Sequence, residues 1–546
     1  MAPVDDERTT SGTGNLGAAT VGLTVPAPHG MVAAADQLAS SAGVDALRAG
    51  GTAADAAVAA GAVLAVTNQH QCGLGGDLFA LVARPGEPVA ALCAAGRAGS
   101  GADAAPMRAD GLERMPPQGD VRAVTVPGCV DGLIELHRRF GRLLLAHVVA
   151  TAAAYAASGF PASPLLAATA GHILGVDGAD DYRLAAEAAG DRLRPGTLVR
   201  RPGVAAALEG IRSEGRAAFY GGPFGEGLVK LGEGLFTPED LERRQADWVT
   251  PLRITAWDHS VWTTPPPSQG YLTLAAAWTA GGLALPDDPD DPSWAHLLAE
   301  AARMAGTDRT DVLFDGADGD ALLDTTRLGE RRAAIDPDRR NPLPWPTAPG
   351  GTTVCCAVDR DRMGVTLILS NASAWGAHIV EPATGVFLHN RGIGFSLAPG
   401  HPAELSPGRR PPHTLAPALV TRPDGSLRAV LGTMGGDSQP QVVLQLLARL
   451  LRASQSSGRS VAAPRWVLGG AGSFRTWDDG GPDQMAIEAH APAAWEEGLA
   501  ARGHDVRRSA VPVDHAFGHA QVIEATDRVL AGVADPRSLD GAAIGY

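Results

Sequence analysis

A short segment past the middle of the chain, in which two glycines precede a threonine-led apolar run, most constrains the fold. It reads GGTTVCCAV from Gly350 to Val358, and after a polar turn a second apolar run follows, Gly364–Asn371. Glycines mark a bend in the backbone, and apolar runs of this length between turn residues are typical of buried strands. The two runs predict an antiparallel hairpin whose simplest register places Thr352 opposite Ser370.

A threonine in this position acquires a chemical role if the chain is cut just before it. After cleavage between Gly351 and Thr352, the new α-amine of Thr352 would titrate at about 7.7–8.0 and serve as general base for its own hydroxyl. The alternative is a plain β-hairpin in which Thr352 and Ser370 only bond to each other, since threonine is common in strands. The spacing alone favours this structural alternative.

The residues of the hairpin, GGTTVCCAVDRDRMGVTLILSN, resemble the processing site of the γ-glutamyltranspeptidase family. The resemblance extends from about Gly30 to Tyr546. It implies autocleavage between Gly351 and Thr352, with Thr352 as nucleophile and Ser370 as the hydroxyl that bonds to it. It also implies an α+β fold, the four-layer αββα sandwich of the N-terminal nucleophile (Ntn) hydrolases, autoprocessed into two subunits.

Other segments match family motifs with catalytic or substrate-binding roles. Gly435 and Gly436 match the oxyanion hole, which needs backbone N–H groups that can approach the reacting oxygen closely. Arg97 matches the arginine that binds the substrate carboxylate, a task suited to a guanidinium, although without the family it would be interpreted as a surface loop residue. The other substrate-binding residues that the resemblance implies are Asn371, Arg391, His413 and Thr414.

The segment HNRGIGFS departs from the family pattern where an amino-acid substrate is selected. Gly394 stands in place of the aspartate that holds the α-ammonium in γ-glutamyl enzymes, and Arg391 stands in place of a glutamine. A site that loses an anion and gains a cation should prefer a carboxylate without a neighbouring ammonium. The pattern resembles the family branch that contains oxamate amidohydrolase and antibiotic-pathway homologues.

Three functions follow from these observations. The family assignment implies acyl hydrolysis or transfer from a small carboxylate-bearing amide, a γ-glutamyl compound such as glutathione. The departures favour an oxamate- or oxalyl-type amide, or a C–C bond, in secondary metabolism. A third alternative is a non-processing binding or regulatory homologue, because Val354, Cys355 and Cys356 replace the polar residues usual after the threonine pair.

Composition excludes several partners and cofactors. The net charge of −15 argues against nucleic acid or an anionic membrane. The five cysteines lack a CxxC spacing and indicate buried thiols of a reducing compartment. The acidic loop Asp287–Asp291 lacks the spaced ligands of a calcium site and predicts a solvated turn. The acyl-transfer mechanism that the resemblance implies needs no metal or organic cofactor. The first thirty residues contain no apolar core of a signal peptide, which favours a cytoplasmic location.

The predicted organisation is a flexible tail (1–25), a large subunit (26–351) and a small subunit (352–546), the last two forming one αββα unit. The fragments should stay associated, and a dimer of the heterodimer remains open. The substrate is a small molecule. Helices are expected in the large subunit at Val124–Phe140, Val148–Ser158, Ser163–Gly175 and Gly203–Glu214.

Overall fold

The computed structural model describes residues 24–342, 351–469, 484–511 and 515–546. The predicted tail (1–25) therefore lies almost entirely outside the described residues, as does most of the proline-rich run that precedes Gly351. Among the described residues, no helix has the length and hydrophobicity needed to cross a membrane.

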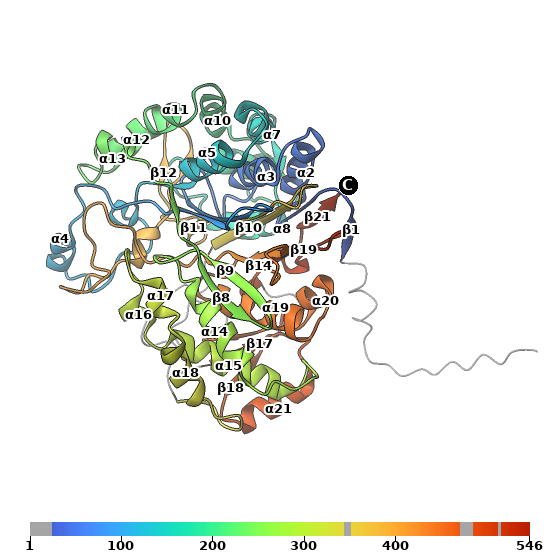
Figure 1. Cartoon of the computed structure of the whole chain (residues 1–546). Coiled ribbons are helices and arrows are strands. Elements are labelled where there is room, and N and C mark those ends of the chain that lie inside the picture. The colour runs from blue at the N-terminus through green and yellow to red at the C-terminus, as the bar shows by residue number, and fades with distance from the viewer. Residues whose placement is uncertain (1–23, 343–350, 470–483, 512–514) are drawn as a thin grey trace, which may run out of the picture.

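Two seven-stranded sheets occupy the centre of the molecule (Figure 1), and neighbouring strands within each are antiparallel. The first sheet has the order β21 (Ala542–Gly545), β2 (Met31–Ala34), β10 (Gly351–Val358), β11 (Gly364–Ala372), β3 (Asp77–Ala83), β4 (Ala90–Ala94), β7 (Asp247–Val249). The second has the order β1 (Val25–Ala27), β20 (Leu530–Ala534), β19 (Ala520–Ala525), β15 (Leu427–Thr433), β14 (Ala418–Thr421), β9 (His259–Thr263), β8 (Leu252–Ala256).

Helices cover the outer face of each sheet (Figure 1). The helices on the side of the first sheet are α2 (Gln37–Arg48), α3 (Ala53–Thr67), α5 (Cys129–Phe140), α6 (Leu145–Val148), α7 (Ala150–Ser158), α8 (Pro164–Thr169), α9 (Asp180–Ala188), α10 (Pro202–Glu214), α11 (Arg216–Tyr220), α12 (Pro223–Leu231) and α13 (Pro238–Glu242). Those on the side of the second sheet are α14 (Tyr271–Gly281), α15 (Pro292–Gly306), α16 (Arg309–Val312), α17 (Gly319–Leu322), α18 (Thr325–Ala333), α19 (Gln439–Leu447), α20 (Ser457–Ala462) and α21 (Ala493–Ala501).

Smaller elements complete the fold. A short helix, α4 (Ala104–Ala109), packs apart from the two helical layers. The minor sheets are formed by β5 (Phe160–Pro161) with β6 (Leu198–Val199), by β12 (Val380–Glu381) with β13 (Val386–Phe387), and by β16 (Trp466–Leu468), β17 (Gln484–Ile487) and β18 (Asp505–Arg508).

Three apolar cores separate the four layers. One lies between the first sheet and its helices, one between the two sheets, and one between the second sheet and its helices. Helix α3 shows why the layers pack tightly: it is mostly alanine and valine and is buried on all sides, as expected of a helix that is apolar all round. The predicted αββα sandwich is therefore the observed architecture.

Strand β10 is central in its sheet and alternates its side chains between two cores. Cys355 and Ala357 belong to the core beneath the helices, whereas Val354 and Cys356 belong to the core between the sheets. The two adjacent cysteines therefore face opposite sides, as predicted, and all five cysteines are buried. Because side chains alternate along a strand, Thr352 faces the space between the sheets.

The predicted helices of the large subunit are present with shifted bounds. The helix expected at Val124–Phe140 begins only at Cys129, because Pro127 disfavours helical backbone at the residue before it and Val124 is extended. The helix expected at Ser163–Gly175 ends at Thr169 and continues as a 3₁₀ turn. The other two predictions correspond to α7 and α10.

Candidate active site

The hairpin of β10 and β11 has the predicted register, with Thr352 opposite Ser370. The register shifts between Gly351 and Thr352, so that Gly351 pairs with Ala372. Such a bulge bends the strand at the peptide bond predicted to be cut. A Cβ atom on Gly351 would lie 2.9 Å from backbone atoms of Ser373, so this position has room only for glycine.

Ser370 connects the predicted nucleophile to the predicted scissile carbonyl. Its Oγ accepts a hydrogen bond from the Thr352 hydroxyl at 3.1 Å and donates one to the Gly351 carbonyl oxygen at 2.7 Å. The Ala372 backbone N–H also donates to Ser370 Oγ, at 2.9 Å. Thr352 and Ser370 are both fully buried. Nucleophile, hydroxyl relay and carbonyl are thus held in one hydrogen-bonded chain.

Arg391 extends this chain on the far side of Ser370. Its guanidinium is fully buried and donates to Ser370 Oγ and to Thr414 Oγ1, both at 3.1 Å. Burial lowers the pKa of Arg391 to about 10, which leaves it protonated at neutral pH. The site therefore contains a buried cation beside the predicted nucleophile. Carboxylate binding by Arg391 and Thr414 stays a prediction.

Asp77 is a buried anion of this site that sequence reasoning did not single out. It pairs with Ser370 across β3 and β11 and accepts from the Gly96 N–H at 2.9 Å. Its other oxygen lies 3.0 Å from His413 Nε2 and 3.3 Å from His389 Nδ1. Burial would raise the pKa of Asp77, but the two histidines outweigh it and hold that pKa well below its usual range. The signal for Asp77 in the sequence was an aspartate placed directly before the apolar run Leu78–Ala83.

His413, a predicted substrate-binding residue, is held by protein groups. Its Nδ1 accepts from the Leu415 N–H at 3.2 Å, which leaves the Nε2–H to donate to Asp77. Burial lowers the pKa of His413 to about 3, so the ring is neutral. In the described structure His413 orients Asp77, and its substrate contact stays a prediction.

The predicted oxyanion loop lies between β15 and α19. Gly435 and Gly436 have φ angles of 136° and 55°, which favour glycine. Within the described part of the chain, neither N–H donates a hydrogen bond. Gln269 ties this loop to the site, since its Nε2 donates to the carbonyls of Gly436 at 2.8 Å and Thr414 at 2.7 Å. Gln269 is not among the residues predicted for the site, because no local motif relates it to the oxyanion loop 167 positions away.

An ion pair lies directly behind the loop. Asp437, the next residue, is fully buried and accepts a hydrogen bond from Arg309. Burial raises the pKa of Asp437 to about 6, against the opposing effect of Arg309. This pair fixes the chain as it leaves the two glycines and enters α19.

Arg97 and Asn371 lie at the same end of the first sheet as the hairpin bulge. The Arg97 guanidinium donates to Asp247 at 2.8 Å, and among the described residues no hydrogen bond joins it to Thr352 or Ser370. A substrate carboxylate would compete with Asp247 for it. The Asn371 amide donates to the Gln69 carbonyl at 2.9 Å, whereas its buried oxygen has no partner among the described residues. Both substrate-binding assignments stay predictions.

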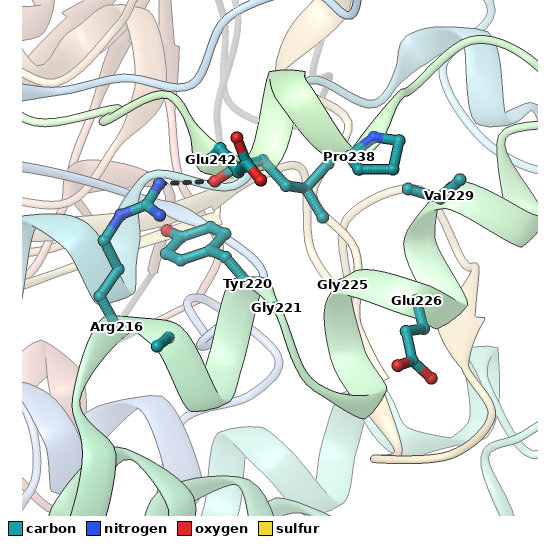
Figure 2. Close-up of a pocket in the computed structure, with 10 residues that line it drawn as sticks. Arg216, Tyr220, Gly221, Gly225, Glu226, Val229, Pro238 and Glu242 are labelled. Atoms are coloured by element: carbon teal, nitrogen blue, oxygen red, sulfur yellow. Dashed lines mark hydrogen bonds between the residues drawn. The ribbon is translucent and has the colours of Figure 1, made fainter.

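A separate cavity of about 660 Å³ opens among α11, α12 and α13 (Figure 2). It contains none of the predicted site residues. Two of its polar side chains bond to the backbone: Arg216 donates to the Leu241 carbonyl at 2.6 Å, and the Tyr220 hydroxyl donates to the Pro127 carbonyl at 2.6 Å. The cavity belongs to the outer helical layer.

An αββα sandwich with a threonine and its hydroxyl partner at the end of a central hairpin defines an Ntn hydrolase. The family model described as gamma-glutamyltranspeptidase matches residues 39–546, and the chain belongs to this family. It is 35% identical to the oxamate amidohydrolase proenzyme of Klebsiella pneumoniae, over 95% of this chain and 98% of that protein. It is 32% identical to the glutathione hydrolase-like YwrD proenzyme of Bacillus subtilis, over 94% and 98%.

A solved structure agrees with the fold over the full length. The cephalosporin acylase from Bacillus halodurans superimposes with a TM-score of 0.87 at 30% identity, covering 100% of this chain and 99% of that chain. The predicted family, fold and enzyme class are thereby confirmed: the protein is a hydrolase or acyltransferase of the Ntn class. Family membership favours an enzyme over the binding or regulatory homologue.

Proposed function

We propose that the chain is a self-processing precursor whose mature form uses Thr352 to cleave a small amide with a carboxylate on its acyl group. The observation that carries this proposal is the hydrogen-bonded chain from Thr352 Oγ1 through Ser370 Oγ to the Gly351 carbonyl. A structural hairpin needs only the first of these bonds. A hydroxyl that also donates to the carbonyl before the nucleophile has the geometry for peptide-bond cleavage.

Processing follows from this geometry. Thr352 Oγ1 attacks the Gly351 carbonyl carbon, its proton passes to Ser370 Oγ, and the proton of Ser370 passes to the carbonyl oxygen. The tetrahedral species collapses as the C–N bond breaks and the Thr352 nitrogen takes a proton, which leaves an ester. Water hydrolyses the ester, releasing the Gly351 carboxylate and a Thr352 with free amine and hydroxyl.

The mature enzyme repeats the chemistry on a substrate. The α-amine of Thr352 accepts the hydroxyl proton as the oxygen attacks the donor carbonyl, and it returns the proton to the leaving amine. The N–H groups of Gly435 and Gly436 stabilise the oxyanion. Water, or an acceptor amine, then releases the acyl group from Thr352.

The donor in this proposal is a short acid amide of the oxamate type. The buried cation of Arg391 supports a carboxylate near the site. Gly394 has no room for the aspartate of γ-glutamyl enzymes, because a Cβ there would lie 2.4 Å from the Pro412 carbonyl oxygen. The relative of 35% identity is itself called an oxamate amidohydrolase. The second candidate donor, a γ-glutamyl compound, rests on the family and on the relative called glutathione hydrolase-like.

The test has two parts. Intact mass under denaturing conditions should give two fragments that meet at Gly351/Thr352, and one uncut chain for Thr352→Ala. The cut protein is then assayed for ammonia release from oxamate and from longer dicarboxylic monoamides, with γ-glutamyl-p-nitroanilide plus glycylglycine as comparison. Robust γ-glutamyl transfer without hydrolysis of the short amides would refute the donor class but leave the nucleophile standing.

The proposed assembly is a permanently associated heterodimer in the cytoplasm. In the first sheet, β10 and β11 of the later fragment lie between β2 and β3 of the earlier one, so separation would break the sheet. Co-elution of both fragments on gel filtration tests the association, and the eluted mass distinguishes one heterodimer from a dimer of heterodimers.

A further inference from the structure

A cluster of two histidines and a glutamate lies on the opposite side of the second sheet from the active site. His296 and Glu300 are one turn apart on α15 and face the same way, and His504 joins them from the loop between α21 and β18. All three side chains are buried, and their ligand-type atoms lie within 4.8 Å of one another. Neither the family chemistry nor the proposed mechanism uses them.

The hydrogen bonds of His296 leave a ring nitrogen directed into the cluster. Its Nε2 lies 2.9 Å from the Asp336 carbonyl oxygen, which can only accept, so the proton is on Nε2. The Nδ1 atom is then unprotonated and carries a free lone pair, and it lies 2.8 Å from His504 Nε2. A histidine whose far N–H is fixed by a backbone carbonyl has the orientation that metal-binding histidines use.

Glu300 is oriented in a comparable way. Its Oε2 accepts from the Asn341 backbone N–H at 2.8 Å, and its Oε1 accepts from Arg303 Nε at 3.3 Å. Each carboxylate oxygen retains a second lone pair, so either can bind an ion while the existing hydrogen bonds hold the group in place.

We propose that His296, Glu300 and His504 bind a zinc ion. Two imidazoles and one carboxylate are a common zinc ligand set, whereas magnesium and calcium require mostly oxygen. Tetrahedral zinc with bonds of about 2.0–2.1 Å places its ligand atoms about 3.4 Å apart. The histidine nitrogens must therefore separate by about half an ångström, and His504 Nε2 must lose its proton to solvent as the metal binds. Water completes the fourth position.

The position of the site gives zinc a structural role. His296 and Glu300 precede the proposed cleavage bond and His504 follows it, so one ion would join the two parts of the chain. The positive charges of Arg303, Arg340 and Arg502 act electrostatically on His504, and they would repel a bound cation. We therefore expect zinc to be held weakly enough for a chelator to remove it. Zinc binding itself does not depend on cleavage.

The direct test is calorimetric titration of the untagged full-length protein, stripped with a chelator, with zinc chloride. We expect one zinc per chain and no binding of magnesium chloride. His296→Gln and His504→Gln should weaken zinc binding by at least about tenfold. The matched control His147→Gln, at an exposed histidine, should bind as wild type does. A wild-type protein that takes up no zinc, or variants that bind it equally well, would overturn the proposal.

Two further measurements cover folding and alternative ligands. Cobalt(II) on the wild-type protein should give the visible bands of a tetrahedral nitrogen and oxygen site; a thiolate charge-transfer band would place the ion on cysteine and refute the site. Zinc should raise the Tm of wild type. The uncut variant Thr352→Ala should also bind one zinc, so failure of the cleavage mechanism and failure of the metal site give different results.

Discussion

Removing the Ser370 hydroxyl is the sharpest test of the processing geometry. In Ser370→Ala, the Gly351 carbonyl loses its donor at 2.7 Å and the Thr352 hydroxyl loses its acceptor at 3.1 Å. Loss of one preorganised donor to a developing oxyanion slows catalysis by about 10²–10³-fold, or about 2.7–4 kcal/mol. We expect self-cleavage to slow by at least that factor, because the same hydroxyl also relays the nucleophile's proton.

The variant also has a predictable cost in stability. Arg391 and the Ala372 N–H lose their shared acceptor, and an unsatisfied buried group costs about 1–3 kcal/mol. The Tm should therefore be lower than that of the wild type, but unfolding should remain cooperative. The assay follows the uncut fraction by intact mass over time after purification, with Thr352→Ala as the uncut baseline.

Ser370→Thr is the matched control, since it keeps a hydroxyl on the same strand. We expect it to cleave much faster than Ser370→Ala. If a folded Ser370→Ala matured at the wild-type rate, the relay would be wrong. If the threonine and alanine variants were equally slow, the slow cleavage would be due to altered packing around Ser370. It would not be due to the loss of the hydrogen bond to the Gly351 carbonyl.

Two glycines and a set of buried histidines give three other testable outcomes. Gly351→Ala should block or greatly slow cleavage, because its Cβ meets the Ser373 backbone at 2.9 Å; cleavage at the wild-type rate, measured by intact mass, would contradict this. Gly394→Asp should lower the Tm without creating γ-glutamyl transfer, since its Cβ lies 2.4 Å from the Pro412 carbonyl; a gain of that activity would show that the loop can adjust. Burial lowers the pKa of His70, His413, His504 and His519 from 6.5 to about 3. The unfolded chain protonates these rings below pH 6.5, whereas the folded protein protonates them only near pH 3. Their contribution to stability is therefore complete above pH 6.5 and is lost as pH falls towards 3, because unfolding takes up protons. Urea unfolding at pH 7.5 and pH 5 should show lower stability at pH 5, with a smaller loss in His519→Gln; equal stability at both pH values would refute it.

Local sequence pattern was sufficient for the central hairpin. The register of Thr352 against Ser370 and the opposite faces of Cys355 and Cys356 follow from short spacings and from the two-residue period of a strand. Family motifs predicted the fold class. The predicted start of α5 at Val124 was wrong, because Pro127 disfavours helical backbone at the residue just before it.

The composition of the site was determined by packing between distant segments. Asp77 and His413 are 336 residues apart in sequence, and Gln269 reaches Gly436 across 167 residues. No local period relates such residues; they meet because the ends of two sheets enclose a common space. The same holds for His296 and His504, 208 residues apart. The sequence alone determined which strands form and which way their side chains face, whereas the stacking of the sheets decided which buried charges lie beside the nucleophile.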